Sequence, residues 1–191
     1  MEPDRKQQII KTAIKRFARH GINKTTLDEI ARDLRIGKAT IYHYFNSKEA
    51  LFFATLQYDS GLILGEIQNI FDNKETSLKE RFTEYLVYKD NIYERYKLIY
   101  DLFAMLLTEE GLEKEIDTLQ KLLKAEEEIL KKALISAYTT KSGSMNPALP
   151  SFFVYASWGM LFSGRLNSIA NVNKPLPTRE FLMKSLEGFL E

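Results

Sequence analysis

Residues 25–51 read TTLDEIARDLRIGKATIYHYFNSKEAL and contain two short helical patterns with a tight turn between them. Thr26 and Glu29 have the spacing of a capping box, which predicts that a helix begins there. Its apolar residues recur at three-to-four spacing and are Leu27, Ile30, Ala31 and Leu34. After a turn of about three residues, a second short helix is predicted over about residues 38–45. Two such helices with a third packed behind them form a helix-turn-helix unit.

The residues before this stretch supply the third helix of the unit. It is predicted over about residues 4–20, with Asp4 as its N-cap and Gly21 ending it. Its buried stripe has the i, i+3, i+4, i+7 spacing and consists of Ile10, Ala13, Ile14 and Phe17. Residues 1–46 are therefore expected to form a small three-helix head.

The rest of the chain also shows helical spacing and no β-branched alternation. A long helix is predicted from about residue 47, capped by Asn46 or Ser47, to about Phe71, and Ser77 with Glu80 forms a second capping box. Further helices are predicted at about 78–90, 93–108, 111–138, 150–170 and 178–190. The predicted fold class is thus all-α with about nine helices, in which residues 47–191 form a larger helical body.

Charge is distributed unevenly between these two parts. Residues 1–56 carry eleven Lys or Arg and six Asp or Glu, a net charge of +5, whereas residues 57–191 carry a net charge of −4. A basic head on an acidic body favours a polyanionic partner for the head, with chance asymmetry as the alternative.

The composition excludes several kinds of chemistry. The chain has no cysteine and only two histidines, which excludes thiol nucleophiles and iron–sulfur clusters and argues against a metal site. No G-x-S-x-G, P-loop or G-x-G-x-x-G motif is present, so we expect neither an enzyme nor a bound cofactor. The longest apolar run, about residues 150–166, is shorter than the ~20 residues of a membrane span, and no apolar signal segment follows Met1. We therefore expect a cytoplasmic protein with no membrane partner.

The helix predicted over residues 38–45 has one apolar and one polar side. Ile41 and Phe45 are four residues apart and point together toward the other two helices. The other sides carry polar and aromatic groups, namely Lys38, Thr40, Tyr42, His43 and Tyr44. Solvated helix faces normally carry Glu and Lys, whereas hydroxyls, an imidazole and a lysine suit phosphates and base edges in a major groove. The alternatives are that the two tyrosines are packing residues and that the histidine makes no base contact.

The run from Arg35 to Leu51 is similar to the signature of the TetR family, the tetracycline-repressor-like transcriptional regulators. The stripe from Ile9 to Phe17, Gly21 and the segment 25–31 follow the pattern of that family in order and spacing. The resemblance covers about residues 5–55, a little over a quarter of the chain. The body resembles the family only in its length and helicity.

The resemblance implies a DNA-facing side of the recognition helix formed by Lys38, Thr40, Tyr42, His43 and Tyr44. It also implies that Thr26 and Lys48, at the starts of two helices, bind phosphates; for Thr26, the role of N-cap is already a sufficient reason for its presence. Two positions depart from the family pattern, because Arg35 stands where glycine is usual and Gly37 where a serine-type cap is usual. Arg35 is therefore expected to adopt a positive φ, to alter the turn slightly or to reach a phosphate.

The predicted helices 93–108 and 150–170 are apolar on nearly all sides and must be covered all round. The chain can achieve this by enclosing them, by dimerising or by leaving a ligand cavity. For 150–170, together with 178–190, we expect a homodimer interface, a four-helix bundle with two helices from each chain. Candidates for lining an apolar ligand cavity are Tyr100, Phe103, Trp158 and Phe162, with ordinary core residues as the alternative. Residues 126–128, three glutamates, are expected to form a solvated helix face.

Together these inferences predict a ligand-responsive transcriptional regulator. It would be a repressor that binds a palindromic double-stranded DNA operator as a homodimer and is released by a small apolar or aromatic effector. The alternative is a helical protein-interaction module with a basic head and no small-molecule ligand.

Overall fold

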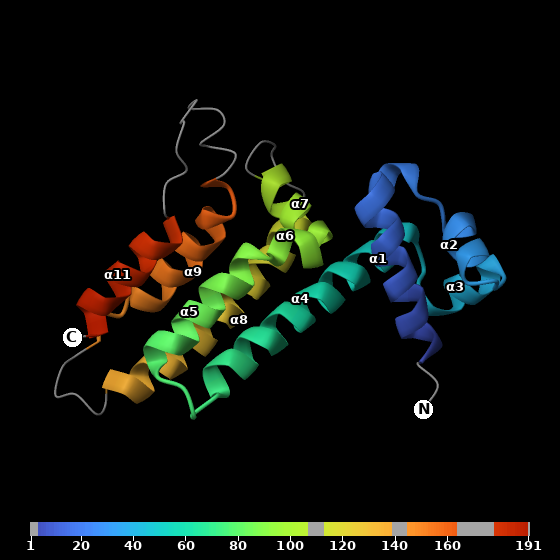
Figure 1. The fold of residues 1–191 in the computed structure, drawn as a ribbon. Coiled ribbons are helices and arrows are strands. Elements are labelled where there is room, and N and C mark those ends of the chain that lie inside the picture. The colour runs from blue at the N-terminus through green and yellow to red at the C-terminus, as the bar shows by residue number, and fades with distance from the viewer. Residues whose placement is uncertain (1–3, 107–112, 139–144, 164–177, 191) are drawn as a thin grey trace. The chain divides into compact units, whose positions relative to one another are not determined.

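The computed structural model describes residues 4–106, 113–138, 145–163 and 178–190, and this part of the chain is helical with no strand (Figure 1). The helices described are α1 (Arg5–Lys24), α2 (Leu27–Asp33), α3 (Lys38–Tyr44), α4 (Lys48–Asp72), α5 (Leu78–Asp90), α6 (Ile92–Arg95), α7 (Lys97–Leu106), α8 (Glu113–Tyr138), α9 (Leu149–Met160) and α11 (Thr178–Leu190). The predicted all-α class is confirmed.

The chain forms two compact units whose bounds differ from the predicted head and body. The first unit comprises Met1–Leu62 and Tyr96–Leu119, and the second comprises Ile63–Arg95 and Gln120–Glu191. The predicted division into a head over residues 1–46 and a body over residues 47–191 stays a prediction.

The first unit contains the three-helix head. α1 packs on α2 and α7, and α2 packs on α3. The centre of the head is formed by apolar side chains that are almost wholly buried, namely Ile9, Ala13, Phe17, Ile30 and Ile41. Asp4 accepts a hydrogen bond from the Lys6 backbone N at 3.2 Å, so it is the N-cap of α1 as predicted. Regular helical geometry is interrupted at Gly21, which has φ 75° and ψ 164° and is the predicted end of the helix.

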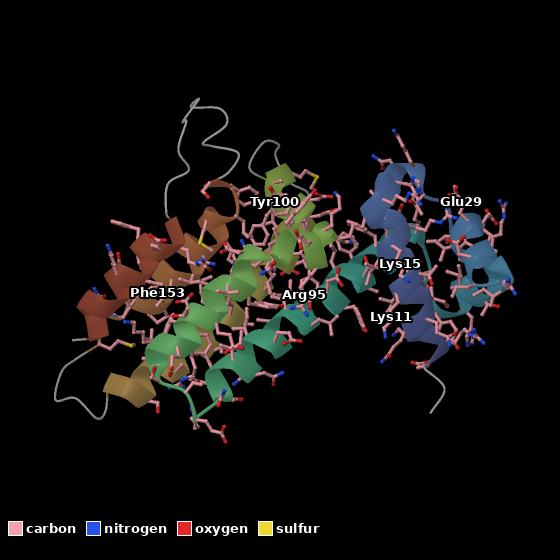
Figure 2. The ribbon with its side chains drawn as sticks, in the orientation of Figure 1. Lys11, Lys15, Glu29, Arg95, Tyr100 and Phe153 are labelled. Atoms are coloured by element: carbon pink, nitrogen blue, oxygen red, sulfur yellow. The ribbon has the colours of Figure 1, made fainter. Side chains whose placement is uncertain are left out.

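The second unit has an aromatic core. Phe82 contacts Phe71, Tyr85 and Phe153 with ring centroids 5.0–6.2 Å apart, so α4, α5 and α9 share one cluster. Figure 2 shows Phe153 on α9. α5, α9 and α11 pack on one another in pairs. The capping box of Ser77 and Glu80 starts α5 as predicted.

Two predicted helices are corrected by the structure. The helix predicted over 93–108 is two helices, α6 and α7, separated at Tyr96. An all-round apolar sequence carries no signal for such a break, because helical spacing continues through it. The helix predicted over 150–170 begins at Leu149 and its regular part ends at Met160, while residues 164–170 lie outside the described part.

Candidate nucleic-acid interface

The recognition helix α3 has the predicted orientation. Ile41 and Phe45 are buried, and α3 packs on α2. Tyr42 is 48 % exposed, and Lys38 and His43 are exposed as well. The remaining two candidates, Thr40 and Tyr44, are half-buried. The His43 and Tyr44 rings pack edge to face at 5.1 Å, so these two side chains support each other at the end of α3.

Lys38 is held at the start of α3 by partners within the head. Its Nζ lies 2.7 Å from Asp28 Oδ2 and 6.0 Å from the centroid of the Tyr42 ring. The hydrogen bond to Asp28 and the charge of that carboxylate raise the pKa of Lys38. Lys38 therefore places a positive charge on the surface of the head, and the negative charge of Asp28 offsets part of it.

The two predicted phosphate contacts lie at helix starts and are engaged in local hydrogen bonds. Thr26 Oγ1 accepts from the Glu29 backbone N at 3.3 Å, and the Glu29 carboxylate accepts from Thr26 N at 2.8 Å, which completes the predicted capping box. The hydrogen bonds that Thr26 N and Thr26 Oγ1 donate to the Glu29 carboxylate lower the pKa of Glu29, which Figure 2 labels on α2. Lys48 Nζ donates to the Ile22 carbonyl at 2.8 Å. Ser47 Oγ accepts from Ala50 N at 3.0 Å and caps α4.

A hollow of about 400 Å³ joins the starts of these helices. It brings together four of the predicted DNA-contacting residues, Thr26, Lys38, Tyr42 and Lys48. The other three, Thr40, His43 and Tyr44, do not line it. Sequence reasoning missed its remaining polar members, which are Thr25, Asp28, Asn46, Ser47 and Glu49. Asn46 and Ser47 carried a usable signal, since polar residues at a predicted helix start supply anion-binding N–H groups and caps.

The turn between α2 and α3 is built around Arg35, whose φ is 54°. Ile36 N donates to the Ala31 carbonyl at 3.0 Å, which closes the end of α2. Of the three alternatives for Arg35, the structure shows the positive φ. This left-handed conformation costs a residue with a Cβ about 1 kcal/mol.

The four candidates for a ligand cavity fall into different units. Tyr100, labelled in Figure 2, and Phe103 are half-buried on α7 in the first unit. Trp158 and Phe162 belong to the second unit, where Trp158 is buried and Phe162 is half-buried. Trp158 Nε1 donates to Glu126 Oε2 at 2.8 Å, which places this ring in a buried polar cluster.

That buried polar cluster is a feature that sequence reasoning missed. Lys89 Nζ lies 2.8 Å from Glu126 Oε1 and 3.4 Å from the centroid of the Trp158 ring, and both charged side chains are fully buried. Tyr85 donates to Glu126 at 2.6 Å and shares a 2.7 Å hydrogen bond with Ser157. Burial lowers the pKa of Lys89 to about 8, against the opposing effect of the Glu126 charge. The expectation that Glu126 lies on a solvated face is therefore wrong, whereas its neighbour Glu128 is exposed.

Two kinds of feature are absent from the described residues. No described helix is long and apolar enough to cross a membrane. Within the same residues, no group of three or more His, Cys, Asp or Glu side chains is arranged to hold a metal ion.

Comparison with known proteins identifies the head. Residues 9–55 match the family model described as bacterial regulatory proteins, tetR family. The chain is 32 % identical over 112 residues to the uncharacterized HTH-type transcriptional regulator YerO of Bacillus subtilis, covering 56 % of this chain and 36 % of YerO. It is 45 % identical over 47 residues to the probable acrEF/envCD operon repressor of Escherichia coli, covering 25 % of this chain and 21 % of the repressor. The matched regions thus span about a third or less of the length of each of these two relatives.

Solved structures share the fold over nearly the whole chain. The reduced form of E. coli NemR superposes with a TM-score of 0.73 at 18 % identity, over 96 % of both chains. FadR of B. subtilis in complex with stearoyl-CoA superposes with a TM-score of 0.67 at 16 % identity, again over 96 % of both chains. Residues 9–55 of the chain are therefore similar to the tetR family of bacterial regulatory proteins, and the helical fold of the chain is one that these solved structures share.

Proposed function

We propose that the chain is a DNA-binding transcriptional regulator that represses its target as a homodimer and releases a palindromic operator when a small apolar or aromatic effector binds. The observation that carries this proposal is the outward side of α3, where Tyr42, His43 and Lys38 are exposed behind a buried Ile41 and Phe45. A relative, the E. coli protein named above, is described as a probable operon repressor. The family is one of regulatory proteins, and we assign the chain no catalytic activity.

Residues 1–46 act as the DNA-binding head in this proposal, and residues 47–191 act as the ligand-binding and dimerisation body. The outer side of α3 enters the major groove through Lys38, Thr40, Tyr42, His43 and Tyr44. Thr26 and Lys48 hold phosphates on either side, at helix N-termini where backbone N–H groups favour anions. The net charge of +5 over residues 1–56 supplies the electrostatic part of the affinity.

Exposed aromatic side chains support dimerisation through the last two helices. Phe152 and Tyr155 on α9 are 45 % and 60 % exposed, and Phe181 on α11 is 69 % exposed. Large exposed apolar rings on two helices that pack against each other favour an interface surface when they form one patch. A two-fold dimer presents two recognition helices, which a palindromic operator reads when they are roughly 34–36 Å apart.

The effector is proposed to bind in the body and to change that separation. Tyr100 and Phe103 in the first unit and, separately, Trp158 and Phe162 in the second unit stay the candidate lining residues, and aromatic rings suit an apolar ligand. A solved structural neighbour, FadR, holds stearoyl-CoA, a ligand with a long apolar chain. To release the operator, the effector must favour the non-binding conformation by a few kcal/mol.

The outward side of α3 is tested with Tyr42→Ala and a matched control. Duplexes are first selected from a randomised library by the wild-type chain, and their affinities are then measured by fluorescence anisotropy over a range of salt concentrations. Tyr42→Ala is expected to weaken binding about tenfold, as loss of one good base or phosphate contact does. Tyr93→Ala removes a tyrosine that is equally exposed (50 %) on α6, and it should leave affinity unchanged.

Two results would contradict the proposal. Equal affinity of the Tyr42→Ala variant and the control would show that this side of α3 does not contact DNA. Failure of the wild-type chain to select any duplex at moderate salt would favour the alternative, a protein-interaction module with a basic head. A steep fall of affinity with salt is expected instead, because lysine contacts displace counterions from phosphates.

A further inference from the structure

A second hollow in the first unit has no part in DNA contact as proposed above. It has a volume of about 530 Å³, within the range of small-molecule sites. Its walls come from three helices: Ile22 and Asn23 at the end of α1, Phe52 and Phe53 near the start of α4, and the first turn of α8. It contains none of the four residues predicted to line an effector cavity.

The apolar wall of this hollow consists of two fixed aromatic rings. Phe52 and Phe53 are half-buried, with ring centroids 5.8 Å apart and planes at 64°. Phe17 supports Phe52 from the core of the head at 5.4 Å. Lys114 Nζ lies 5.8 Å from the centroid of the Phe53 ring, so a cation of this chain already uses that ring. An aromatic ring near a carboxylate-rich surface is a favourable place for a positive charge.

The polar wall is acidic. Three carboxylates line the hollow, those of Glu49, Glu113 and Glu115, against the one ammonium of Lys114, which leaves a net charge of −2. Glu115 is only 6 % exposed, and its Oε2 has no hydrogen-bond partner among the described residues. A buried carboxylate oxygen without a partner destabilises the chain, and a ligand that brings a positive charge to it removes that cost.

We propose that this hollow binds an organic cation with an apolar, aromatic body. The rings of Phe52 and Phe53 receive the apolar part, and Glu115 and Glu49 receive the positive charge. An anionic ligand in the hollow would be repelled by the three carboxylates, and a neutral apolar ligand would leave Glu115 without a partner. The site is therefore selective for charge as well as for shape.

A ligand in this hollow would affect the DNA-contacting side of the head through two residues next to Lys48, Ile22 and Glu49, and this step rests on the proposed function. Ile22, near the end of α1, lines the hollow, and its backbone carbonyl accepts a hydrogen bond from Lys48 Nζ. Glu49, the next residue along α4, lines both this hollow and the one at the helix starts. A cation that displaces Ile22 or Glu49 changes the position of Lys48, which is a proposed phosphate contact.

The test is calorimetric titration of the full chain with two probes of the same shape and opposite charge, tetraphenylphosphonium and tetraphenylborate. The phosphonium is expected to bind, and the borate to bind at least about tenfold more weakly. Glu115→Gln is expected to weaken phosphonium binding about tenfold or more, the usual effect of losing a charged partner. Glu49→Gln alters an exposed side chain, and it should weaken binding about threefold.

The control is Glu84→Gln, which removes an exposed carboxylate on α5 outside the hollow and should leave binding unchanged. Equal binding of the two probes, no binding of the phosphonium, or unchanged binding in both Glu115→Gln and Glu49→Gln would overturn the site. The titration contains no DNA, so failure of the chain to bind any duplex would overturn the proposed function and leave this result standing.

The link to DNA has its own measurement. Tetraphenylphosphonium is expected to release a selected duplex from the wild-type chain and to release much less from Glu115→Gln. A duplex that stays bound while the calorimetric site is filled would overturn the step through Ile22 and Lys48.

Discussion

Asp59 on α4 is expected to make the stability of the chain fall as pH rises. Its side chain is only 4 % exposed, and its Oδ2 has no hydrogen-bond partner among the described residues. Burial, with no compensating charge, raises the pKa of this carboxyl to about 7. In the unfolded chain the same group titrates near 3.9. Between these two values the folded chain binds a proton that the unfolded chain has lost.

The sign and the size follow from this difference in bound protons. Because the folded state holds the extra proton, the free energy of unfolding decreases with pH by about 1.4 kcal/mol per unit between the two pKa values. The contribution of Asp59 to the free energy of unfolding is highest below about pH 4, and it is fully lost above about pH 7. A separation of about three units corresponds to roughly 4 kcal/mol. Asn at position 59 has the same shape and no charge, so Asp59→Asn removes this loss.

The assay is urea unfolding followed by circular dichroism at several pH values, at one protein concentration because the proposed dimerisation would add to stability. The quantity compared is the free energy of unfolding of Asp59→Asn minus that of the wild type. It should rise from near zero at about pH 4 to roughly 4 kcal/mol at about pH 8. Glu66→Gln removes an exposed carboxylate from the same helix, and its difference from the wild type should stay small throughout. Parallel curves for Asp59→Asn and the wild type would show that Asp59 ionises normally and would refute the reasoning.

Three further substitutions have defined expected outcomes. Arg35→Gly should raise the free energy of unfolding by about 0.5–1 kcal/mol, because glycine adopts a φ of 54° without strain. A lower free energy of unfolding, measured in urea, would contradict this. Lys89→Met should lower it by about 3–5 kcal/mol, since the Glu126 carboxylate stays buried without its counter-charge, and adding Glu126→Gln should restore most of the loss if charge is the cause. Asp28→Asn should free the charge of Lys38 for the DNA and make the slope of log affinity against log salt steeper by about 0.9; an unchanged slope would mean that Lys38 displaces no counterion.

The parts of the fold that the sequence predicted are those with local signals. The capping boxes of Thr26 with Glu29 and of Ser77 with Glu80 each involve residues three apart, and both were found where predicted. Asp4 and Gly21, which cap and interrupt α1, act on the backbone within a few residues of themselves. The buried side of α3 followed from the spacing of two residues in one short helix. None of these predictions needed knowledge of a distant contact.

The buried cluster was missed because its partners are distant in sequence. Glu126 lies between apolar positions of α8 but beside two other glutamates, and local pattern assigns such a run to solvent. Its partners Lys89 and Tyr85 are 37 and 41 residues away. A buried glutamate needs several donors at once, and no pattern within one helix contains them. The same reason explains why Lys48 was predicted as a phosphate contact without its Ile22 partner.

The head presents its proposed DNA contacts already bound to partners of its own. Lys38 is bound to Asp28, Thr26 to Glu29, and Lys48 to the Ile22 carbonyl. Each of these three DNA contacts would therefore replace an existing hydrogen bond rather than add one, and the net gain per contact is small. Affinity would then depend on counterion release and on the geometry of two heads, because both act without new hydrogen bonds. A regulator whose DNA contacts are individually weak is sensitive to small displacements of those contacts. The Ile22 carbonyl accepts a hydrogen bond from Lys48, and Ile22 also lines the acidic hollow. A cation bound in that hollow would therefore act on Lys48 through Ile22.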